Sequence, residues 1–314
     1  MILVTGATGF IGRRLLPWLH AEGEQVRILL RPRHSSPRLP TGLAMEVALT
    51  SLADLRGVRA AMVGVDRVIH LASAAGDGPR GDLYATDVAG TENVVQAAAD
   101  ASVSHLVYLS HLGASRSSAY PVLRTKALAE EHIRQSGLPH LILRCGLVFG
   151  PNDRFVTRLA MMLSAAPGVL PVPGEGATLI HPLWLEDLVT ALQWLLDDPQ
   201  AAAGTHEVGG PEHLSLRQIL ELVQATTGVR RYLMPVRPAY MRGLVWLIER
   251  LLPRAPLNTH ALDYLASNRT APLDSMVRLA GLQPSRLAER VEFLAGRRWG
   301  WQLLRQQLAA GSAG

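Results

Sequence analysis

The sequence predicts an α/β protein with a doubly wound parallel sheet and a smaller C-terminal α/β lobe. Three observations predict it. Short apolar runs alternate with helical patterns over the first 150 residues, which is typical of successive βαβ units. A glycine-rich turn follows the first apolar run, and beyond residue 150 prolines and glycines become frequent while the helical segments shorten. We therefore expect one domain over 1–150, with 184–208 packing back on it, a second lobe over 151–296 and a C-terminal tail over 297–314.

Apolar runs of strand length mark the expected strands of the first domain. They are Met1–Thr5, Gln25–Leu30, Arg67–Ala72, His105–Ser110 and Leu141–Phe149. Between them, apolar residues at helical spacing predict helices at Gly12–Ala21, Leu55–Val63, Asp87–Ala101 and Val122–Ser136. Residues 31–42 are rich in Pro, Ser and Arg and are expected to form a loop.

The second lobe is expected to contain shorter elements. They are strands at Leu179–Pro182 and His206–Val208 and helices at Trp184–Asp198 and Ser215–Thr227. Ser215 stands three residues before Gln218, which is the spacing of an N-cap and its capping-box partner. Tyr240–Leu252 carries apolar residues on one helical face, as a helix packed in the core does. The tail mixes Trp and Leu with Arg over Arg297–Leu308, so a membrane surface, a partner protein and docking on the chain's own fold all remain open.

Composition excludes several classes of protein. With 48% apolar residues the chain is not generally disordered, and the single cysteine, Cys145, excludes a disulfide scaffold. No apolar run reaches the roughly 18 residues of a membrane span, and no secretory signal is visible, so we expect a cytoplasmic protein, with attachment to the inner membrane left open. The eleven histidines lack ligand spacing, so no metal site is expected.

The net charge of +5 does not indicate a nucleic-acid partner. Of the 31 basic residues 30 are Arg, and they are spread along the chain rather than gathered in a stripe or a reading helix. A set of basic residues that is almost entirely arginine is better explained by a bias in amino-acid composition than by selection for a partner. We therefore expect no DNA or RNA binding.

The turn after the first strand reads Thr5-Gly6-Ala7-Thr8-Gly9-Phe10-Ile11-Gly12. In such a turn, Gly6 permits the tight bend and Gly9 lets backbone N–H groups approach a pyrophosphate. Gly12 lets the following helix pack closely on the strand, and the helix N-terminus adds positive potential. Against the alternative of a purely structural turn, this position in a βαβ unit favours the dinucleotide site of a Rossmann domain.

The type of dinucleotide follows from the end of the second strand. Sites specific for NAD place an acid there for the ribose 2′-hydroxyl, whereas a basic residue suits a 2′-phosphate. Here Leu30 is followed by Arg31 and, shortly after, Arg33, with no acid between them. The planar guanidinium matches phosphate, so the sequence favours NADP(H) over NAD(H).

Further motifs follow the glycine turn in order. They are Gly64-Val-Asp66-x-Val-Ile-His70-Leu-Ala-Ser73, Gly90-Thr-x-Asn93, Leu109-Ser110, Lys126 and Arg144 with Val148-Phe-Gly-Pro151. With them the chain resembles the extended and atypical short-chain dehydrogenase/reductase superfamily, whose members include epimerases and dehydratases. Later motifs resemble the branch of the accessory Rossmann subunit of respiratory complex I, namely Pro173-Gly-x-Gly176, His181-Pro182, Glu186-Asp187 and Gly209-Gly-Pro211.

The resemblance implies a set of cofactor-binding residues. They are Gly6, Thr8, Gly9, Phe10, Ile11, Gly12, Arg31, Leu71, Ala72, Ser73, Lys126, Cys145 and Val148. It also implies chemistry in which a Ser steadies the substrate oxygen, a Tyr transfers the proton, and a Lys holds the nicotinamide ribose and lowers the pKa of that Tyr. Ser110 and Lys126 match this pattern.

The tyrosine of the pattern is missing. Val122 stands four residues before Lys126, and Tyr120 could act only by reaching in from the loop before the helix. His111 or His181 could also replace the tyrosine, because the pKa of histidine lies near neutrality, although a hydrogen-bonded structural role is the favoured interpretation of each. Two smaller departures are Asp87, where many relatives carry Asn, and Cys145, where many carry Pro, which suits buried packing better than a reactive thiol.

Lys126 is the only lysine of the chain. A position that keeps Lys among 30 arginines suggests that a compact ammonium is needed there, so the cofactor pocket looks maintained while the proton donor looks lost. We expect an NADP(H)-binding protein with an altered active site that serves as a structural, assembly or sensing protein. The alternative is an NADPH-dependent reductase or epimerase-like oxidoreductase using Lys126 and a surrogate acid. Besides the nicotinamide dinucleotide, an apolar small molecule or a membrane-associated protein complex remains open as a partner.

Overall fold

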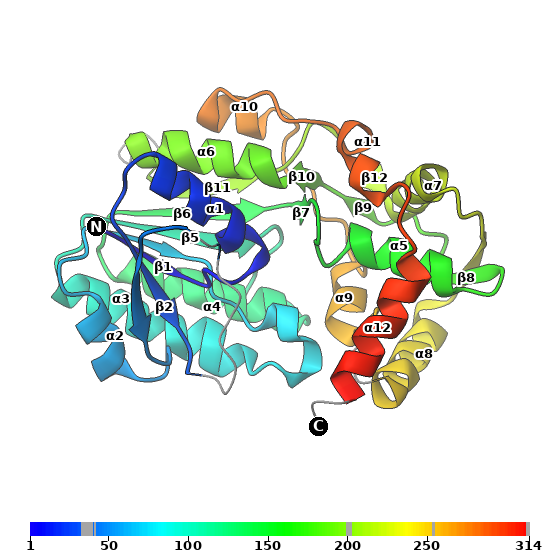
Figure 1. Ribbon diagram of the computed structural model, residues 1–314, viewed down its shortest axis with the longest axis horizontal. Helices are drawn as coiled ribbons and strands as arrows, with labels where there is room; N and C mark the ends of the chain where they lie inside the picture. Colours follow the sequence, from blue (N-terminus) through cyan, green and yellow to red (C-terminus); the bar gives the residue numbers. More distant parts are fainter. Residues whose placement is uncertain (33–39, 41, 199–202, 253–254, 312–314) are drawn as a thin grey trace. The chain divides into compact units, whose positions relative to one another are not determined.

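The computed structural model describes residues 1–32, 40, 42–198, 203–252 and 255–311 (Figure 1). The chain forms two compact units. The first contains Met1–Cys145, Leu185–Val208 and Ser275–Leu282, and the second contains Gly146–Trp184, Gly209–Asp274 and Gln283–Gly314. Segment Ser275–Leu282, which we expected in the second lobe, therefore belongs to the first unit.

The first unit is built on a seven-stranded parallel sheet. Its strands, in spatial order, are β11 (Gly204–Val208), β6 (His140–Cys145), β5 (His105–His111), β4 (Arg67–His70), β1 (Ile2–Thr5), β2 (Val26–Leu30) and β3 (Glu46–Leu49). The strand order reverses at β1, which pairs with both β2 and β4. The predicted doubly wound α/β fold is confirmed, and the reversal lies where such sheets bind ligands.

Helices cover both faces of this sheet (Figure 1). One face carries α1 (Phe10–Ala21) and α6 (Leu185–Asp197), which contact each other. The other carries α2 (Leu55–Ala61), α3 (Gly90–Asp100) and α4 (Pro121–Gln135), and the unit also contains α10 (Ser275–Ala280). Because helices lie on both sides, strand β1 is buried at all four residues, as a central parallel strand must be.

Three local differences separate the expected elements from the observed ones. Strand β3 was not predicted, because it is a mostly exposed edge strand without a continuous apolar run. The helix expected from Asp87 is preceded by a π-helical turn, η2 (Tyr84–Ala89), and a 3₁₀ segment, η1 (Ala75–Arg80). The strand expected over Leu141–Phe149 breaks at Gly146, where a Cβ would lie 2.2 Å from the His181 carbonyl oxygen.

The second unit contains short strands and helices. The strands form three pairs: β7 (Leu147–Phe149) with β10 (Pro182–Trp184), β8 (Val169–Pro173) with β13 (Tyr232–Val236), and β9 (Leu179–Ile180) with β12 (Leu214–Ser215). The helical segments are α5 (Val156–Ala165), α7 (Leu216–Thr227), α8 (Pro238–Leu251), α9 (Thr259–Tyr264), α11 (Leu287–Arg290), η3 (Val291–Leu294) and α12 (Trp299–Gly311).

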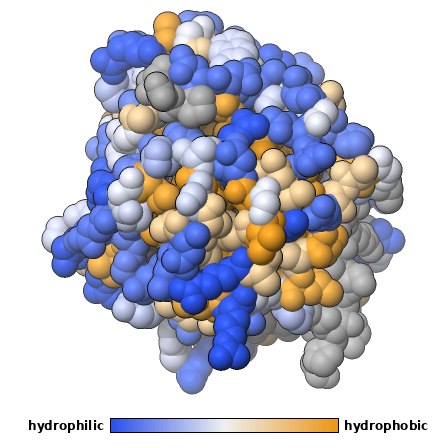
Figure 2. Space-filling view, turned by 90° about the vertical axis from the view of Figure 1, so that its left-hand side faces the viewer, coloured by the Kyte–Doolittle hydropathy of each residue, from blue (hydrophilic) through white to orange (hydrophobic). Residues whose placement is uncertain are grey.

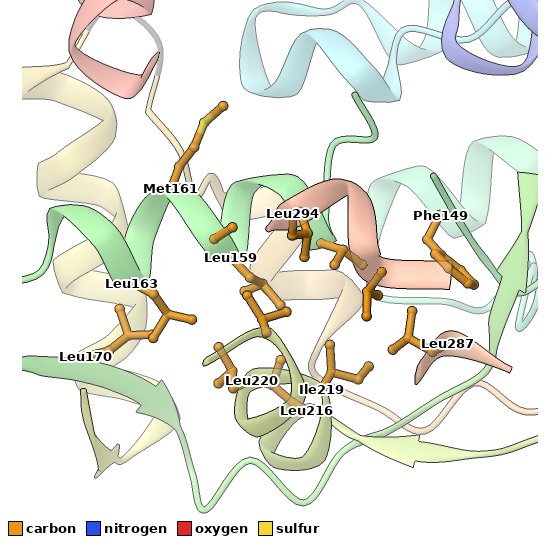
Figure 3. Close-up of a cluster of buried hydrophobic side chains, with 14 of the residues drawn as sticks. Phe149, Leu159, Met161, Leu163, Leu170, Leu216, Ile219, Leu220, Leu287 and Leu294 are labelled. Atoms are coloured by element: carbon orange, nitrogen blue, oxygen red, sulfur yellow. The ribbon is translucent and has the colours of Figure 1, made fainter. Parts of the chain in front are cut away.

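A separate apolar core holds the second unit together (Figure 3). Leu163 of α5, Ile219 of α7 and Leu294 of η3 are fully buried in it. The capping box predicted at the start of α7 is present, with Gln218 N donating to Ser215 Oγ at 3.2 Å and Ser215 N donating to Gln218 Oε1 at 2.8 Å. Helix α12 packs on α5 and buries Trp299, so the part of the tail described here docks on the chain's own fold.

Apolar side chains also remain at the surface. Figure 2 shows them interspersed with hydrophilic ones on the face that it turns to the reader. Isolated exposed apolar residues are normal in proteins, and those that line up along a helix are the informative ones. The helix expected to pack in the core over Tyr240–Leu252 is such a case. Met241 and Val245 pack in a small core with Leu257 and Leu262, whereas Leu244 and Leu251 are exposed, so the expectation holds for one face of the helix only. No helix in the described parts of the chain is long and apolar enough to span a membrane.

Candidate functional site

The glycine turn has the conformation that its sequence predicts. Gly6 adopts φ +67°, and a Cβ there would lie 2.6 Å from Ala72 N in the segment after β4. A Cβ on Gly12 would lie 2.6 Å from the Gly6 carbonyl oxygen. Side chains at either position would push the backbone apart, so glycine is required for the turn and for the close seating of α1.

The N-terminus of α1 fits an anionic group. Gly9 is the exposed N-cap residue, and it offers no side chain to the first-turn amides. Its own N–H donates to the Gly6 carbonyl oxygen at 2.9 Å, which closes the turn, and the first turn of the helix contains no acid. First-turn amides have no intrahelical partner, and they lie at the positive end of the helix dipole. Thr8, Phe10 and Ile11 are half-buried around the turn, and backbone amides at a helix N-terminus suit a phosphate group.

Backbone amides of the segment after β4 donate to Thr5, the residue before the glycine turn. Leu71 N donates to the Thr5 carbonyl oxygen at 3.2 Å, and Ala72 N donates to Thr5 Oγ1 at 3.3 Å. Ser73 Oγ accepts from Ala75 N at 3.2 Å. The structure therefore brings the predicted cofactor-binding residues 71–73 alongside the glycine turn.

A buried histidine lies beneath this segment. His70 Nδ1 is 2.6 Å from Thr5 Oγ1, and Nε2 is 2.9 Å from Thr91 Oγ1. Because Thr91 donates its own proton to the Asp87 carbonyl oxygen, it must accept from Nε2, which leaves Nδ1 as an acceptor from Thr5. Burial, with the nearby Lys126 charge, lowers the pKa of His70 to about 3, so the neutral ring is the stable form.

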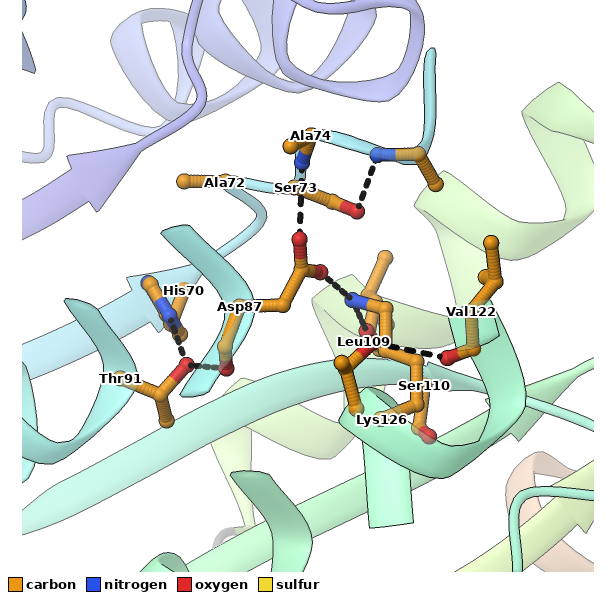
Figure 4. Close-up of polar contacts among 12 residues, drawn as sticks. His70, Ala72, Ser73, Ala74, Asp87, Thr91, Leu109, Ser110, Val122 and Lys126 are labelled. Atoms are coloured by element: carbon orange, nitrogen blue, oxygen red, sulfur yellow. Dashed lines mark hydrogen bonds and ion pairs between the residues drawn. The ribbon is translucent and has the colours of Figure 1, made fainter. Parts of the chain in front are cut away.

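Lys126 lies at the centre of the buried polar groups (Figure 4). Its Nζ donates to the Leu109 carbonyl oxygen at 3.2 Å and lies 3.3 Å from Asp87 Oδ1. It also lies 4.7 Å from the centre of the Tyr108 ring. Burial alone would lower the pKa of Lys126, but Tyr108 and Asp87 outweigh burial and raise it above the ordinary value. The ammonium is therefore held charged in an interior position.

Asp87 supplies the counter-charge. It is 1% exposed, and its second oxygen accepts from Ala74 N at 2.8 Å, so one carboxylate joins Lys126 to the segment after β4. The sequence marked Asp87 only as a departure from the asparagine of many relatives. The structure gives the departure a physical role, because an amide could make the hydrogen bond but could not balance the charge of Lys126.

Ser110 is directed to a different partner. Its hydroxyl donates to Glu130 Oε1 at 2.6 Å, and the fully buried Glu130 also binds Arg144 at 2.7 Å and Arg134 at 3.1 Å. Burial would raise the pKa of Glu130, but the bonds from Arg144 and Ser110 outweigh it and keep that pKa below its ordinary value. Sequence reasoning missed Glu130; the available signal was an acid one helical turn after Lys126 on the same face of α4.

The first turn of α4 contains the position at which the family pattern has its tyrosine. Helix α4 begins at Pro121, and Val122 lies half-buried in its first turn with its carbonyl oxygen accepting from Thr125 Oγ1 at 3.1 Å. Tyr120 is the N-cap residue, with extended backbone at φ −92° and ψ 119°. Tyr120 therefore precedes the helix, and no tyrosine stands one turn before Lys126.

Two other candidates are held in packing roles. His181 is fully buried; its Nε2 donates to the Gly210 carbonyl oxygen at 2.7 Å and its Nδ1 accepts from Ala271 N at 3.0 Å. Burial lowers the pKa of His181 to about 4, and both ring nitrogens are hydrogen-bonded, so the structure favours the structural role of His181 over that of a surrogate acid. Cys145 ends β6 and is buried, which raises its pKa to about 12 and leaves the thiol unreactive.

The remaining predicted residues are placed as follows. His111 ends β5 and is half-buried, and Val148 lies in β7 of the second unit, also half-buried. Arg31 follows β2, about half exposed, with a terminal nitrogen 3.7 Å from Asp77 Oδ2. Arg33 lies outside the described residues. Asp77 is an acid near the end of β2 that the sequence did not reveal, because it comes from the segment after β4. Within the described part of the chain, no cluster of His, Cys, Asp and Glu could hold a metal ion.

Comparisons with known proteins agree with this geometry. The profile of a family described as NAD(P)H-binding matches residues 6–158. The chain is 31% identical to the sterol demethylase protein B of Methylococcus capsulatus over 90% of this chain and 93% of the relative. It is 27% identical to the 2-alkyl-3-oxoalkanoate reductase of Stenotrophomonas maltophilia, over 90% and 94%.

A third relative comes from a respiratory enzyme. The chain is 29% identical to the mitochondrial NADH dehydrogenase [ubiquinone] 1 alpha subcomplex subunit 9 of Arabidopsis thaliana, over 70% of this chain and 56% of the relative. Among solved structures, UDP-glucose 4-epimerase of Thermus thermophilus in complex with NAD superposes with a TM-score of 0.69 at 21% identity, covering 93% of this chain and 97% of that one. With the glycine turn, the doubly wound sheet and these relatives together, the chain belongs to the extended and atypical short-chain dehydrogenase/reductase family of NAD(P)-binding proteins.

Proposed function

We propose that the chain holds NADP(H) in its first unit and serves as a structural, assembly or sensing protein, without the tyrosine-dependent turnover of its family. One observation carries the proposal: Lys126 and Ser110 are both engaged by buried carboxylates, Asp87 and Glu130, and Val122 replaces the proton donor. Removing a positioned general acid reduces a rate by about 10²–10⁴-fold, so the loss of the tyrosine alone weakens any reduction strongly. The relative that is a subunit of NADH dehydrogenase supports such a role.

In this proposal each group has a binding or holding role. The first-turn amides of α1 hold the diphosphate, and Lys126 presents a fixed positive charge towards the nicotinamide ribose. Asp87 keeps Lys126 charged and fixes the segment after β4 through Ala74 N. When bound, the cofactor would supply a hydride, or its oxidised and reduced forms would differ in the shape and charge that the protein senses.

The 2′-phosphate of NADP(H) is assigned to Arg31. Its present partner Asp77 is 3.7 Å away, and both side chains are about half exposed. An ion pair of this kind contributes about 0–1 kcal/mol, so a phosphate with its higher charge would displace the carboxylate. Arg31→Ala should weaken NADPH binding far more than NADH binding in calorimetric titrations, and Asp77→Asn should tighten NADPH alone. Equal losses for both coenzymes in Arg31→Ala would remove this assignment.

The decisive experiment begins with the purified chain. Any bound nucleotide is released and identified, and NADPH oxidation is then followed with a panel of quinones, aldehydes, keto-sugars and 3-oxo acyl compounds. We expect NADP(H) to be bound and no panel compound to be reduced, even by Val122→Tyr. The matched control variant is Arg124→Met, at an exposed position of the same helix. Turnover that is lost in Lys126→Met but kept in Arg124→Met would contradict the proposal.

A second function has specific support. Two relatives, matched over 93% and 94% of their length, are a protein named for sterol demethylation and an enzyme named as a reductase. The corresponding candidate is reduction of a ketone on an apolar substrate: hydride from NADPH adds to the carbonyl carbon and a proton adds to its oxygen, giving an alcohol and NADP⁺. The proton would come from Tyr120, His111 or water. Panel turnover lost in Tyr120→Phe would select this candidate and name its acid.

We also propose where the protein is located and what it binds besides the dinucleotide. A reducing, cytoplasmic location is supported by the single, buried Cys145. An apolar small molecule or a membrane-associated protein complex is the proposed partner besides the dinucleotide, and nucleic acid is not proposed because the arginines form no stripe.

A further inference from the structure

Helix α8 carries an apolar stripe that faces away from the fold. Tyr240, Leu244, Leu247 and Leu251 are 70%, 36%, 47% and 70% exposed. Their spacing places them within about 60° of one another around the helix. The adjacent face buries Met241 and Val245, so the exposed stripe is additional to the face that anchors the helix.

Helix α12 repeats the arrangement. Trp301, Leu304 and Leu308 are 56%, 46% and 65% exposed, and they stand at the i, i+3, i+7 spacing of one helical face. Its other face docks on the fold through Trp299, whose ring N–H donates to the Leu294 carbonyl oxygen at 2.8 Å. Both helices border α5, because Met162 of α5 packs against the cores beneath α8 and beneath α12.

The charges around the two stripes are almost all positive. Exposed arginines accompany both helices, namely Arg237, Arg242 and Arg250 at α8 and Arg297, Arg298 and Arg305 at α12. Of these, Arg242 is paired with Asp263 of α9. Residues 297–311 contain no acid, and the single acid of α8, Glu249, accepts hydrogen bonds from Thr259. Arg250 stacks on the exposed Trp246 at 4.6 Å, an aromatic–arginine pair suited to the boundary between lipid chains and headgroups.

We propose that the stripes of α8 and α12 bind the surface of an anionic lipid bilayer. The leucines enter the boundary of the acyl chains, and Tyr240, Trp246 and Trp301 lie at headgroup level. The exposed arginines of the two helices other than Arg242 pair with lipid phosphates. Charge complementarity favours lipid over a second copy of the chain, since a symmetric contact would bring the arginines beside the apolar stripes against the same arginines of the second copy. The inference holds for either proposed function.

The first test is sedimentation of the full chain with vesicles. Binding is measured to phosphatidylcholine alone and to phosphatidylcholine mixed with phosphatidylglycerol, at low and high salt. We expect binding to the mixed vesicles that weakens with salt, and weak binding to the neutral ones. Equal binding to both vesicle types, or none to either, would overturn the proposal.

The second test compares matched double variants. Leu251→Glu with Leu308→Glu replaces one residue of each stripe and should reduce binding about tenfold or more. The control, Leu49→Glu with Val63→Glu, makes the same charge change at two positions of the first unit that are each 70% exposed, and should bind normally. Equal loss in both variants overturns the proposed surface.

The third test uses tryptophan fluorescence to locate the surface that meets the lipid. Lipids brominated near the headgroup should quench the fluorescence of the unmodified chain, and Trp246→Phe with Trp301→Phe should remove most of that quenching. Unchanged quenching in the double variant overturns the orientation. The chain could instead self-associate without lipid and fail to bind vesicles. If Leu251→Glu with Leu308→Glu then abolishes the self-association, the surface belongs to a second copy and the lipid partner is overturned.

Discussion

Lys126 shows how a single charge is kept inside a parallel sheet protein. The ammonium is 4% exposed, and Asp87, 1% exposed, is its ion-pair partner. A buried pair of this kind adds little net stability compared with apolar residues, but breaking it leaves one charge without compensation. The value of the pair therefore lies in keeping a positive charge at a defined place, joined through Asp87 to the segment after β4.

Replacing Asp87 tests this directly. Asp87→Asn should lower the pKa of Lys126 and reduce the free energy of unfolding by about 3–5 kcal/mol, because the buried ammonium loses its counter-charge. Urea unfolding measures the loss. The control Asp100→Asn removes an exposed partner of Arg59 at 2.7 Å and should change stability by less than about 1 kcal/mol. Similar effects at the two positions would contradict the role given to Asp87.

Gly6 and Gly23 form a matched pair for a second prediction. Both have positive φ, +67° and +76°, but a Cβ meets the Leu71–Ala72 backbone at Gly6 and nothing within 4 Å at Gly23. Gly23→Ala should cost only the conformational penalty of about 1–2 kcal/mol and keep nucleotide binding. Gly6→Ala should cost more and abolish nucleotide binding in calorimetry. Retained binding in Gly6→Ala would remove the turn from the site.

At the scale of elements, Glu130 connects three of them. It projects from α4, accepts from Ser110 of β5 and binds Arg144 of β6. Ser110 is thereby part of the packing between the helix and the sheet. The hydroxyl of Ser110, which the family pattern marks for catalysis, is therefore used in this chain for a buried hydrogen bond between the helix and the sheet.

Ser110→Ala follows from that bond. The variant should destabilise the chain by about 1–3 kcal/mol, because one oxygen of a buried carboxylate loses its donor. Thermal unfolding measures this, and NADPH affinity should be unchanged. Ser104→Ala, which removes an exposed hydroxyl bonded at 3.0 Å to the Asp66 carbonyl oxygen, is the control and should be nearly neutral. A large loss of NADPH affinity in Ser110→Ala would return this serine to the cofactor site.

Elements with strong local signals were predictable from the sequence. The buried strands of the first unit, the glycine turn and the Ser215 capping box all follow from neighbouring residues. Strand β3 could not be predicted, since its pairing with β2 is the only reason it is a strand. The break at Gly146 and the engagement of Ser110 by Glu130 depend on partners distant in the sequence, so local patterns do not contain them.

For the whole molecule, buried histidines set a dependence of stability on pH. The pKa of His70 is lowered from 6.5 to about 3 and that of His181 from 6.5 to about 4, one in each unit. Below pH 6.5, the ordinary pKa of histidine, these two side chains are protonated in the unfolded chain but stay neutral in the folded chain, so acidification favours unfolding. The contribution is complete above pH 6.5 and is lost as the pH falls towards 4 and then 3.

Urea midpoints measured between pH 7.5 and 4.5 should fall with acidification. Each histidine contributes about 1.4 kcal/mol per pH unit across its window. His181→Asn should be less stable at neutral pH and show a shallower slope, whereas His206→Asn, at a more exposed position on edge strand β11, should leave the slope unchanged. An unchanged slope in His181→Asn would contradict the buried neutral ring.

The order of segments between the two units has a consequence for synthesis. The chain passes between the units five times, and edge strand β11 and helix α10 reach the first unit only at residues 204–208 and 275–280. On the ribosome, the nascent N-terminal sheet must therefore wait for most of the polypeptide to emerge before its last strand is added. Until then the unpaired side of β6 is open to solvent and to chaperones, and truncation at any single peptide bond leaves one unit incomplete.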